Sequence, residues 1–238
     1  MSVDVTYFRI ERIIKSGVEC FLCALEDEIE RKYIDVYLSE LVMDAKSREK
    51  LIESGGFCNH HFHRMLAIAM RPESSDGHGV ALIAQSIIEK MVQDLRKQKK
   101  HGREAFHQKT VCPACTHLVN MMEIYIKKIV ELLASRDEEF LSLFKNSKGL
   151  CIPHLTALLK TLEDATPNKN QDIIKIIIDV EEKNLQHLKL ELLEHVRRQG
   201  CEFSDLDRKA VEDVPLRSVQ KIVGRRGVKV MGGLLANE

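Results

Sequence analysis

Apolar residues recur every three or four positions along most of this chain, which is the spacing of one face of an α-helix. Two such stripes cover residues 22–41 and 118–133, and two more cover residues 80–95 and 173–196. No segment shows the alternation of apolar and polar residues that is typical of a half-buried strand. The pattern therefore predicts an all-α fold.

Shorter helices are expected between the long ones. The first pair covers residues 47–53 and 137–145, and each ends at a glycine signal, Gly55-Gly56 or Gly149. Glycine favours the left-handed conformation that terminates many helices. A second pair covers residues 62–70 and 155–162, and polar segments with proline follow each of these.

The chain changes character after Gly200. Ser204 followed by Asp207 resembles a capping box and predicts the start of a short helix. A second short helix is expected over residues 216–223, and the segment from Gly224, which is rich in glycine, is expected to form a flexible tail.

One cysteine and histidine pattern occurs twice along the chain. Cys20 and Cys23 form a Cys-x-x-Cys pair, and an equivalent pair follows 92 residues later at Cys112 and Cys115. Two Cys-x-x-His pairs are related in the same way, with an offset of 93 residues: Cys58 with His61, and Cys151 with His154. Six of the seven cysteines thus belong to two matching sets, which indicates a duplicated unit.

The repeat predicts the domain organisation. We expect a first helical repeat over residues 5–105, a second over residues 106–200, and C-terminal short helices with a flexible tail over residues 201–238. The two repeats could form separate bundles or the halves of one bundle related by a pseudo-twofold axis. We favour one helical bundle of two tandem pseudo-repeats, because each long helix has a wide apolar face.

Each repeat carries the donors for one Cys3His metal site. Three thiolates and one imidazole match the ligands that a tetrahedral zinc ion prefers, and helix N-termini would stabilise the resulting net negative charge. The simpler assignment pairs the motifs within each repeat, and a swap between repeats would suit an intertwined bundle. The expected metal ligands are Cys20, Cys23, Cys58 and His61 for site one, and Cys112, Cys115, Cys151 and His154 for site two.

The favoured cofactor is zinc, two ions per chain, and the alternative is a pair of iron–sulfur clusters. Reactive dithiols are a further option, although the strand-helix-strand setting of thioredoxin-like proteins is missing. His60, His63 and His117 lie near the motifs but are not repeated, so we interpret them as exposed or outer-shell residues. No catalytic residue is assigned.

Composition narrows the function classes. The 36 basic and 36 acidic side chains leave a formal net charge of zero, and tryptophan is absent, so a nucleic-acid partner is not expected. No apolar run is long enough for a membrane span or resembles a signal peptide, so we expect a cytoplasmic protein without a membrane partner. Phosphate-binding loops and hydrolase motifs are absent. The favoured function is a non-enzymatic scaffold or interaction module with a protein partner, and the alternative is a redox or electron-transfer protein.

The doubled Cys-x-x-Cys and Gly-x-Cys-x-x-His arrangement resembles an uncharacterised family of prokaryotic helical proteins, a domain of unknown function. The resemblance covers roughly residues 5 to 200. It implies a cytoplasmic protein of bacterial or archaeal origin, and it implies no activity, substrate or partner. The residues that carry it are Cys20, Cys23, Leu25, Tyr33, Gly56, Phe57, Cys58 and His61 in the first repeat, and Cys112, Cys115, Gly149, Leu150, Cys151 and His154 in the second.

Overall fold

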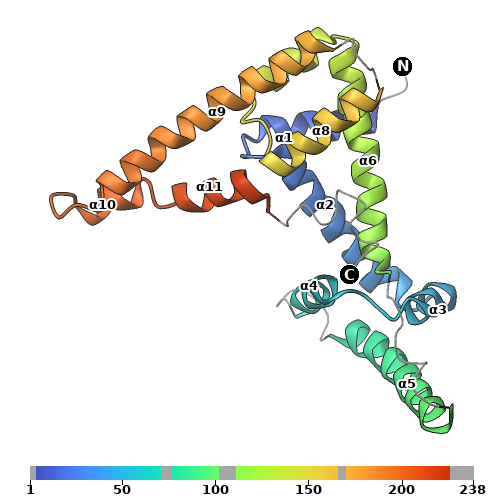
Figure 1. Ribbon diagram of the computed structural model, residues 1–238. Coiled ribbons are helices and arrows are strands. Elements are labelled where there is room, and N and C mark those ends of the chain that lie inside the picture. The colour runs from blue at the N-terminus through green and yellow to red at the C-terminus, as the bar shows by residue number, and fades with distance from the viewer. Residues whose placement is uncertain (1–3, 71–76, 102–110, 166–169, 226–238) are drawn as a thin grey trace. The chain divides into compact units, whose positions relative to one another are not determined.

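The computed structural model describes residues 4–70, 77–101, 111–165 and 170–225, and these ranges contain helices and no strands (Figure 1). The all-α prediction is therefore confirmed. The helices are α1 (Val5–Lys15), α2 (Phe21–Val36), η1 (Tyr37–Leu41), α3 (Ala45–Glu53), α4 (Asn59–Ala69), α5 (His78–His101), α6 (Pro113–Ala134), α7 (Glu138–Lys145), α8 (Ile152–Ala165), α9 (Gln171–Arg197), α10 (Asp205–Lys209) and α11 (Val214–Val223).

Two helical features were not expected from the sequence. Helix α1 precedes the first motif; the Asp4 side chain caps it by accepting from the Thr6 and Tyr7 amides, and its inner face buries Ile10 and Ile13. Helix α2 continues into η1, one π-helical turn in which the Val42 amide donates to the Tyr37 carbonyl. The single long helix predicted over residues 22–41 therefore changes its hydrogen-bond register at Tyr37.

The chain divides into two compact units. Unit 1 comprises the described residues of Met1–Asp27 and Met121–Glu238, and unit 2 comprises those of Glu28–Asn120. The boundaries fall inside α2 and α6, so each unit contains a part of both helices. Each unit therefore combines segments from both sequence repeats, whereas the repeat boundaries 5–105 and 106–200 stay a prediction from the sequence.

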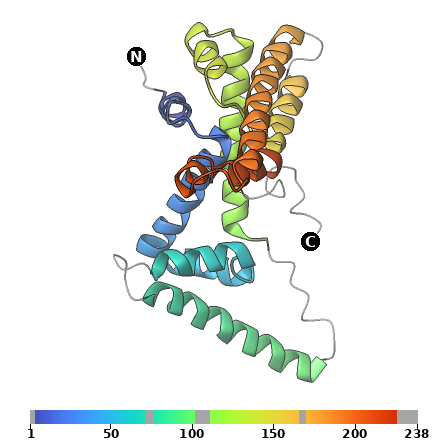
Figure 2. The ribbon, with the colours of Figure 1, turned by 90° about the vertical axis from the view of Figure 1, so that its left-hand side faces the viewer.

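Unit 2 is built around α5, with α3 and α4 packed along it in both views (Figures 1 and 2). Its core includes Tyr37 and Phe57, whose rings meet edge to face with centroids 5.1 Å apart. Gly56 has a φ of 99°, and the Phe62 ring and the Ile87 side chain occupy the space beside it. The predicted glycine stop after α3 thus also admits apolar side chains to the core.

Unit 1 contains α9, the longest helix among the described residues, and α11 folds back to pack on α8 and α9 (Figure 1). Aromatic rings connect its N-terminal segment to α7. The rings of Phe21 and Phe144 meet edge to face with centroids 6.2 Å apart, and the ring centroids of Tyr7 and Phe140 are 6.4 Å apart. The inner face of α11 is unusual because it buries Lys221 and Ser218 together with Val214.

The C-terminal helices agree with the sequence predictions. Ser204 and Asp207 form a capping box at the start of α10, and α11 covers the predicted second helix. Residues 226–238, which hold most of the expected flexible tail, lie outside the described residues. Within the described ranges no helix combines the length and the apolar character needed to cross a membrane.

Candidate metal centres

The eight predicted ligands form two clusters. Cluster A consists of Cys20, Cys23, Cys151 and His154, and its four donor atoms all lie within 4.8 Å of one another. Cluster B consists of Cys58, His61, Cys112 and Cys115, within the same limit. Cluster A lies in unit 1 and cluster B lies in unit 2.

The pairing of motifs differs from the simpler assignment made from the sequence. Each Cys-x-x-Cys pair meets the Cys-x-x-His pair of the other repeat, so pairing within a repeat is wrong and the swapped arrangement is the one observed. The physical reason is that the first cysteine pair belongs to unit 1, with the second Cys-x-x-His loop, while the second cysteine pair belongs to unit 2.

Helix N-termini present all eight donors. The first residue of each motif, Cys20, Cys58, Cys112 or Cys151, directly precedes a helix, and its carbonyl accepts the first helical amide hydrogen bond. The second donor is the third residue of that helix. Side chains at these two positions face each other, as they do in a capping box, and the helix dipole favours negative charge there. The spacing of two intervening residues thus brings two donors to one ion.

The donor atoms of cluster A are in contact with one another. The Cys151 sulfur lies 3.6 Å from the sulfurs of both Cys20 and Cys23. Nδ1 of His154 lies 3.4 Å from Cys20 Sγ, 3.3 Å from Cys23 Sγ and 3.0 Å from Cys151 Sγ. All four side chains are buried.

Cluster B has nearly the same geometry. Nδ1 of His61 lies 3.1 Å from Cys58 Sγ, 3.4 Å from Cys112 Sγ and 3.3 Å from Cys115 Sγ. The sulfurs of Cys58 and Cys115 are 3.7 Å apart. Cys58 is only half-buried, whereas its three partners are buried.

These separations match a single tetrahedral ion. With zinc–sulfur bonds of about 2.3 Å and zinc–nitrogen bonds of about 2.05 Å, tetrahedral angles place sulfurs about 3.8 Å apart and sulfur about 3.6 Å from nitrogen. A disulfide would need a sulfur separation of about 2.05 Å, and all seven cysteines are free. Each cluster could therefore hold one metal ion.

The protonation of the thiols shows why a cation suits these clusters. Burial raises the pKa of the Cys20 thiol well above its ordinary value, whereas hydrogen bonds with Cys151 and Cys20 lower the pKa of Cys23. In cluster B, hydrogen bonds with Cys112 and Cys115 lower the pKa of Cys58, and hydrogen bonds with Cys112 and Cys58 raise that of Cys115. In the absence of a cation these shifts favour the ionised form of some thiols in each cluster and the protonated form of others. A bound divalent ion would favour the ionised form of all three thiols.

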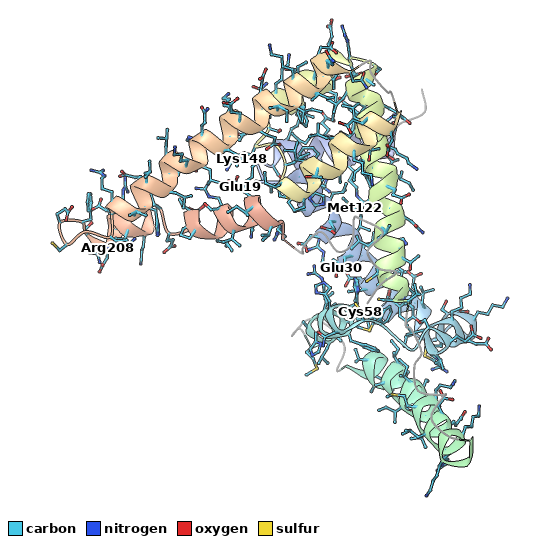
Figure 3. All side chains as sticks on the ribbon, in the orientation of Figure 1. Glu19, Glu30, Cys58, Met122, Lys148 and Arg208 are labelled. Atoms are coloured by element: carbon cyan, nitrogen blue, oxygen red, sulfur yellow. The ribbon has the colours of Figure 1, made fainter. Side chains whose placement is uncertain are left out.

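A buried carboxylate lies behind the histidine of cluster B. Glu30 Oε1 is 3.1 Å from His61 Nε2, the ring nitrogen that faces away from the sulfurs. The same carboxylate meets His60 Nε2 at 2.7 Å and Arg64 Nε at 3.0 Å. Figure 3 marks Glu30 and Cys58 in unit 2. A carboxylate in this position can orient the ring, and it leaves Nδ1 for the metal.

Cluster A has a related but looser arrangement. Glu26 Oε2 lies 3.9 Å from His154 Nε2, and both side chains are buried. Glu26 and Glu30 lie one turn apart on α2, and each faces the histidine of its own unit. Neither residue was expected from the sequence to lie beside a ligand; the available signal was that Glu26, Glu30 and Tyr33 follow helical spacing beside the apolar stripe.

The remaining histidines near the motifs are not donors of either cluster. His60 contacts Glu30, His63 Nδ1 lies 2.8 Å from the Asn59 carbonyl, and His117 stacks on Tyr33 with ring centroids 4.7 Å apart. Burial lowers the pKa of His117. The seventh cysteine, Cys201, is exposed and lies outside both clusters.

Comparisons with known proteins assign the chain to a family whose function is unknown. Neither the curated proteins nor the solved structures gave a match to this chain. A family profile described as a family of unknown function (DUF6062) matches residues 1–229. This match confirms the resemblance stated from the motifs: the chain belongs to that uncharacterised family.

Proposed function

We propose that the protein is a zinc-dependent helical scaffold, in which one zinc ion at cluster A and one at cluster B fasten the helices of their units. The observation that supports this proposal is the spacing of the donor atoms, which fits one tetrahedral ion at each cluster. Three thiolates and one imidazole are soft donors that suit zinc. The ions would tie together segments whose nearest ligands are 128 residues apart at cluster A and 51 apart at cluster B.

A structural role is favoured over a catalytic one. Catalytic zinc keeps a coordination position open for water and is bound by three protein ligands, whereas structural zinc is closed by four. Each cluster here supplies four protein donors at mutual contact distance. The nearby His60, His63 and His117 have contacts of their own, which fits the interpretation of a non-enzymatic protein.

Iron–sulfur clusters are the alternative raised by the ligand types. Their thiolates bind different irons, with bridging sulfides between them, so the ligand atoms stand farther apart than around one ion. The sulfur separations of 3.6 and 3.7 Å therefore favour a mononuclear site. A cytoplasmic location belongs to the same proposal, because a reducing compartment keeps such thiols available for metal.

Elemental analysis of protein purified without oxygen tests the metal assignment. We expect about two zinc ions per chain and a colourless sample. A brown sample with iron and an absorption band near roughly 400 nm would support iron–sulfur clusters instead.

Circular dichroism before and after metal removal by a chelator tests the scaffold role. We expect lower helicity and a lower Tm in the metal-free protein, because binding free energy at structural zinc sites contributes to folding. A metal-free chain with unchanged helicity and Tm would contradict the scaffold role while leaving the metal assignment intact.

A further inference from the structure

The C-terminal end of α11 lies directly on cluster A. The backbone amide of Arg225 donates to Cys23 Sγ at 3.5 Å. A Cβ atom placed on Gly224, whose φ is 76°, would lie 3.4 Å from Cys151 Sγ and 3.7 Å from Cys23 Sγ. The chain therefore passes over two of the sulfurs at contact distance, at a residue without a side chain.

A buried ion pair connects α11 to the loop that presents Cys151. Lys221 Nζ lies 2.9 Å from Glu181 Oε2 on α9, with both side chains almost completely buried, and it donates to the Lys148 carbonyl at 2.7 Å. The other oxygen of Glu181 accepts from the amide of Leu150, the residue before Cys151. Lysine is rarely buried without a partner, so this pair fixes where α11 and the loop meet.

A second contact connects α11 to the segment that presents Cys20. Arg217 Nη1 lies 3.0 Å from Glu19 Oε1, and Glu19 directly precedes Cys20. The same guanidinium makes two hydrogen bonds with Glu191 on α9, at 2.9 and 3.0 Å. Lys148 also meets Glu19 at 3.0 Å, and Figure 3 marks both residues. Helix α11 therefore contacts both chain segments that supply ligands to cluster A.

The loops that precede the two Cys-x-x-His motifs are packed in different ways. In the loop of cluster A, the Glu181 carboxylate occupies the space beside the backbone of Gly149. In the loop of cluster B, apolar atoms of Phe62 and Ile87 occupy the space beside Gly56, the equivalent residue of the first motif. Cluster B is packed by the apolar core of unit 2, and the loop of cluster A is held by a charge pair that α11 completes.

We propose that α11 is an integral part of cluster A, with Lys221 and Glu181 as positioning residues, so that metal occupancy of this cluster and docking of α11 stabilise each other. The proposal rests on the proposed function, since it requires that cluster A binds a metal ion. Coupling of this kind is reciprocal: if docking of α11 raises the metal affinity of cluster A, then the bound metal stabilises the docked α11 by the same free energy.

Metal-release kinetics test one direction of the coupling. The zinc-loaded full chain is mixed with a chromophoric chelator, and release of the two zinc ions is followed as two kinetic phases. The phase that remains in the Cys58→Ser variant, which lacks a ligand of cluster B, is assigned to cluster A. In Lys221→Met and Gly224→Ala we expect release from cluster A to become faster by about 10–100-fold, the usual effect on affinity of losing an outer-shell contact. Release from cluster B in the same molecules should stay unchanged.

The controls separate positioning from general damage. Leu216→Ala alters an exposed side chain on the outer face of α11 and should leave both phases unchanged. The double variant Lys221→Met with Glu181→Gln removes both charges, avoids an unpaired buried charge, and should fold yet still release metal from cluster A faster. Equal rates of release from cluster A in wild type, Lys221→Met, Gly224→Ala and the double variant would overturn the proposal.

Hydrogen exchange tests the reverse direction. Emptying cluster A with Cys151→Ser should lower amide protection in Val214–Val223, whereas emptying cluster B with Cys58→Ser should not. Equal protection of α11 in the two variants would contradict the coupling. If the wild-type chain instead contains no metal by elemental analysis, the proposed function itself is wrong, and this result differs from unaltered release of two bound ions.

Discussion

Glu30 and His61 meet inside unit 2, with Oε1 of the glutamate 3.1 Å from Nε2 of the histidine and both side chains buried. The opposite ring nitrogen, Nδ1, faces the three sulfurs of cluster B. The carboxylate thus lies on the side of the ring opposite the sulfurs, which leaves Nδ1 available to a metal. Such outer carboxylates orient a ligating histidine and increase its basicity.

Replacing Glu30 should weaken metal binding at cluster B alone. For Glu30→Gln we expect a loss of about 10–100-fold in zinc affinity at cluster B, measured by competition with a chelator of known affinity, because an amide can present either its oxygen or its nitrogen to His61. Glu40→Gln makes the same charge change at an exposed position and should have no effect. An unchanged affinity in Glu30→Gln would show that the negative charge of Glu30 has no role in binding.

The observed pairing of motifs predicts how double variants differ. Cys20→Ser with Cys151→Ser removes two ligands of cluster A, so the chain should retain one zinc ion. Cys20→Ser with Cys58→Ser removes one ligand from each cluster, so both ions should be weakened. Elemental analysis after dialysis against a weak chelator measures the difference, and pairing within repeats would give the reverse result.

The sequence could predict which residues are ligands, but not which Cys-x-x-Cys pair meets which Cys-x-x-His pair. Helical periodicity and glycine stops located the repeated helices, and nearly equal offsets of 92 and 93 residues identified all eight donors that the clusters contain. Connecting Cys23 to Cys151 instead of Cys58 lengthens the loop from 35 to 128 residues, which costs only about 1 kcal/mol in closure entropy. This difference is small beside the packing of buried side chains, so the partnering depends on which helices pack together.

The same limit applies to the residues around the ligands. Lys221 and Glu181 have ordinary charged positions in the sequence, and only the packing of α11 on α9 shows that they form a buried pair. Helix α1 could have been found, because Asp4 precedes a segment in which Ile10, Ile13 and Ile14 share one face. Residues whose role depends on contacts between distant helices leave no local pattern.

The two ligand histidines predict opposite pH trends for metal-free and metal-loaded protein. Burial lowers the pKa of His61, but contacts with Cys112 and Cys58 raise it more, to about 9. Contacts with Cys151 and Cys23 likewise outweigh burial at His154 and raise its pKa to about 10. Folded-state pKa values above the ordinary 6.5 stabilise the metal-free fold below that pH, and the contribution is lost as pH rises through 9 to 10.

Metal binding requires the neutral imidazole and ionised thiols, so zinc affinity should rise with pH and binding should release protons. The lowered pKa values of Cys23 and Cys58 contribute with the opposite sign below the ordinary thiol value of 9.0, so the thiol and histidine contributions offset each other between pH 6.5 and 9. Thermal unfolding from pH 6 to pH 10 should therefore show a Tm that falls above about pH 9 for the metal-free chain and no such fall for the zinc-loaded chain. Proton release on zinc addition can be followed in weak buffer with an indicator dye. A metal-free Tm that rises towards pH 10 would contradict the assignment of the raised pKa values.

Substitutions at two glycines with nearly equal φ angles distinguish the cost of backbone strain from the cost of a steric overlap. Gly17 has a φ of 70° with no atom within 4 Å of an added Cβ, whereas Gly149 has a φ of 72° and an added Cβ would overlap the Glu181 carboxylate. Gly17→Ala should cost about 1–2 kcal/mol of unfolding free energy, the penalty of left-handed backbone for a residue with a Cβ. Gly149→Ala should cost more, because it adds displacement of Glu181 from Lys221, and breaking a buried pair costs about 3–5 kcal/mol.

Urea unfolding of the two alanine variants, each with zinc bound and each after metal removal, measures both costs. Displacement of Glu181 also disturbs the amide of Leu150 beside Cys151, so Gly149→Ala should release the ion of cluster A faster, while Gly17→Ala should release it at the wild-type rate. Combining Gly149→Ala with Glu181→Ala and Lys221→Met removes the overlap without leaving an unpaired buried charge, and should recover part of the lost stability. Equal destabilisation by the two single substitutions would mean that the Glu181 carboxylate moves aside without cost, and that the pair with Lys221 does not hold the loop.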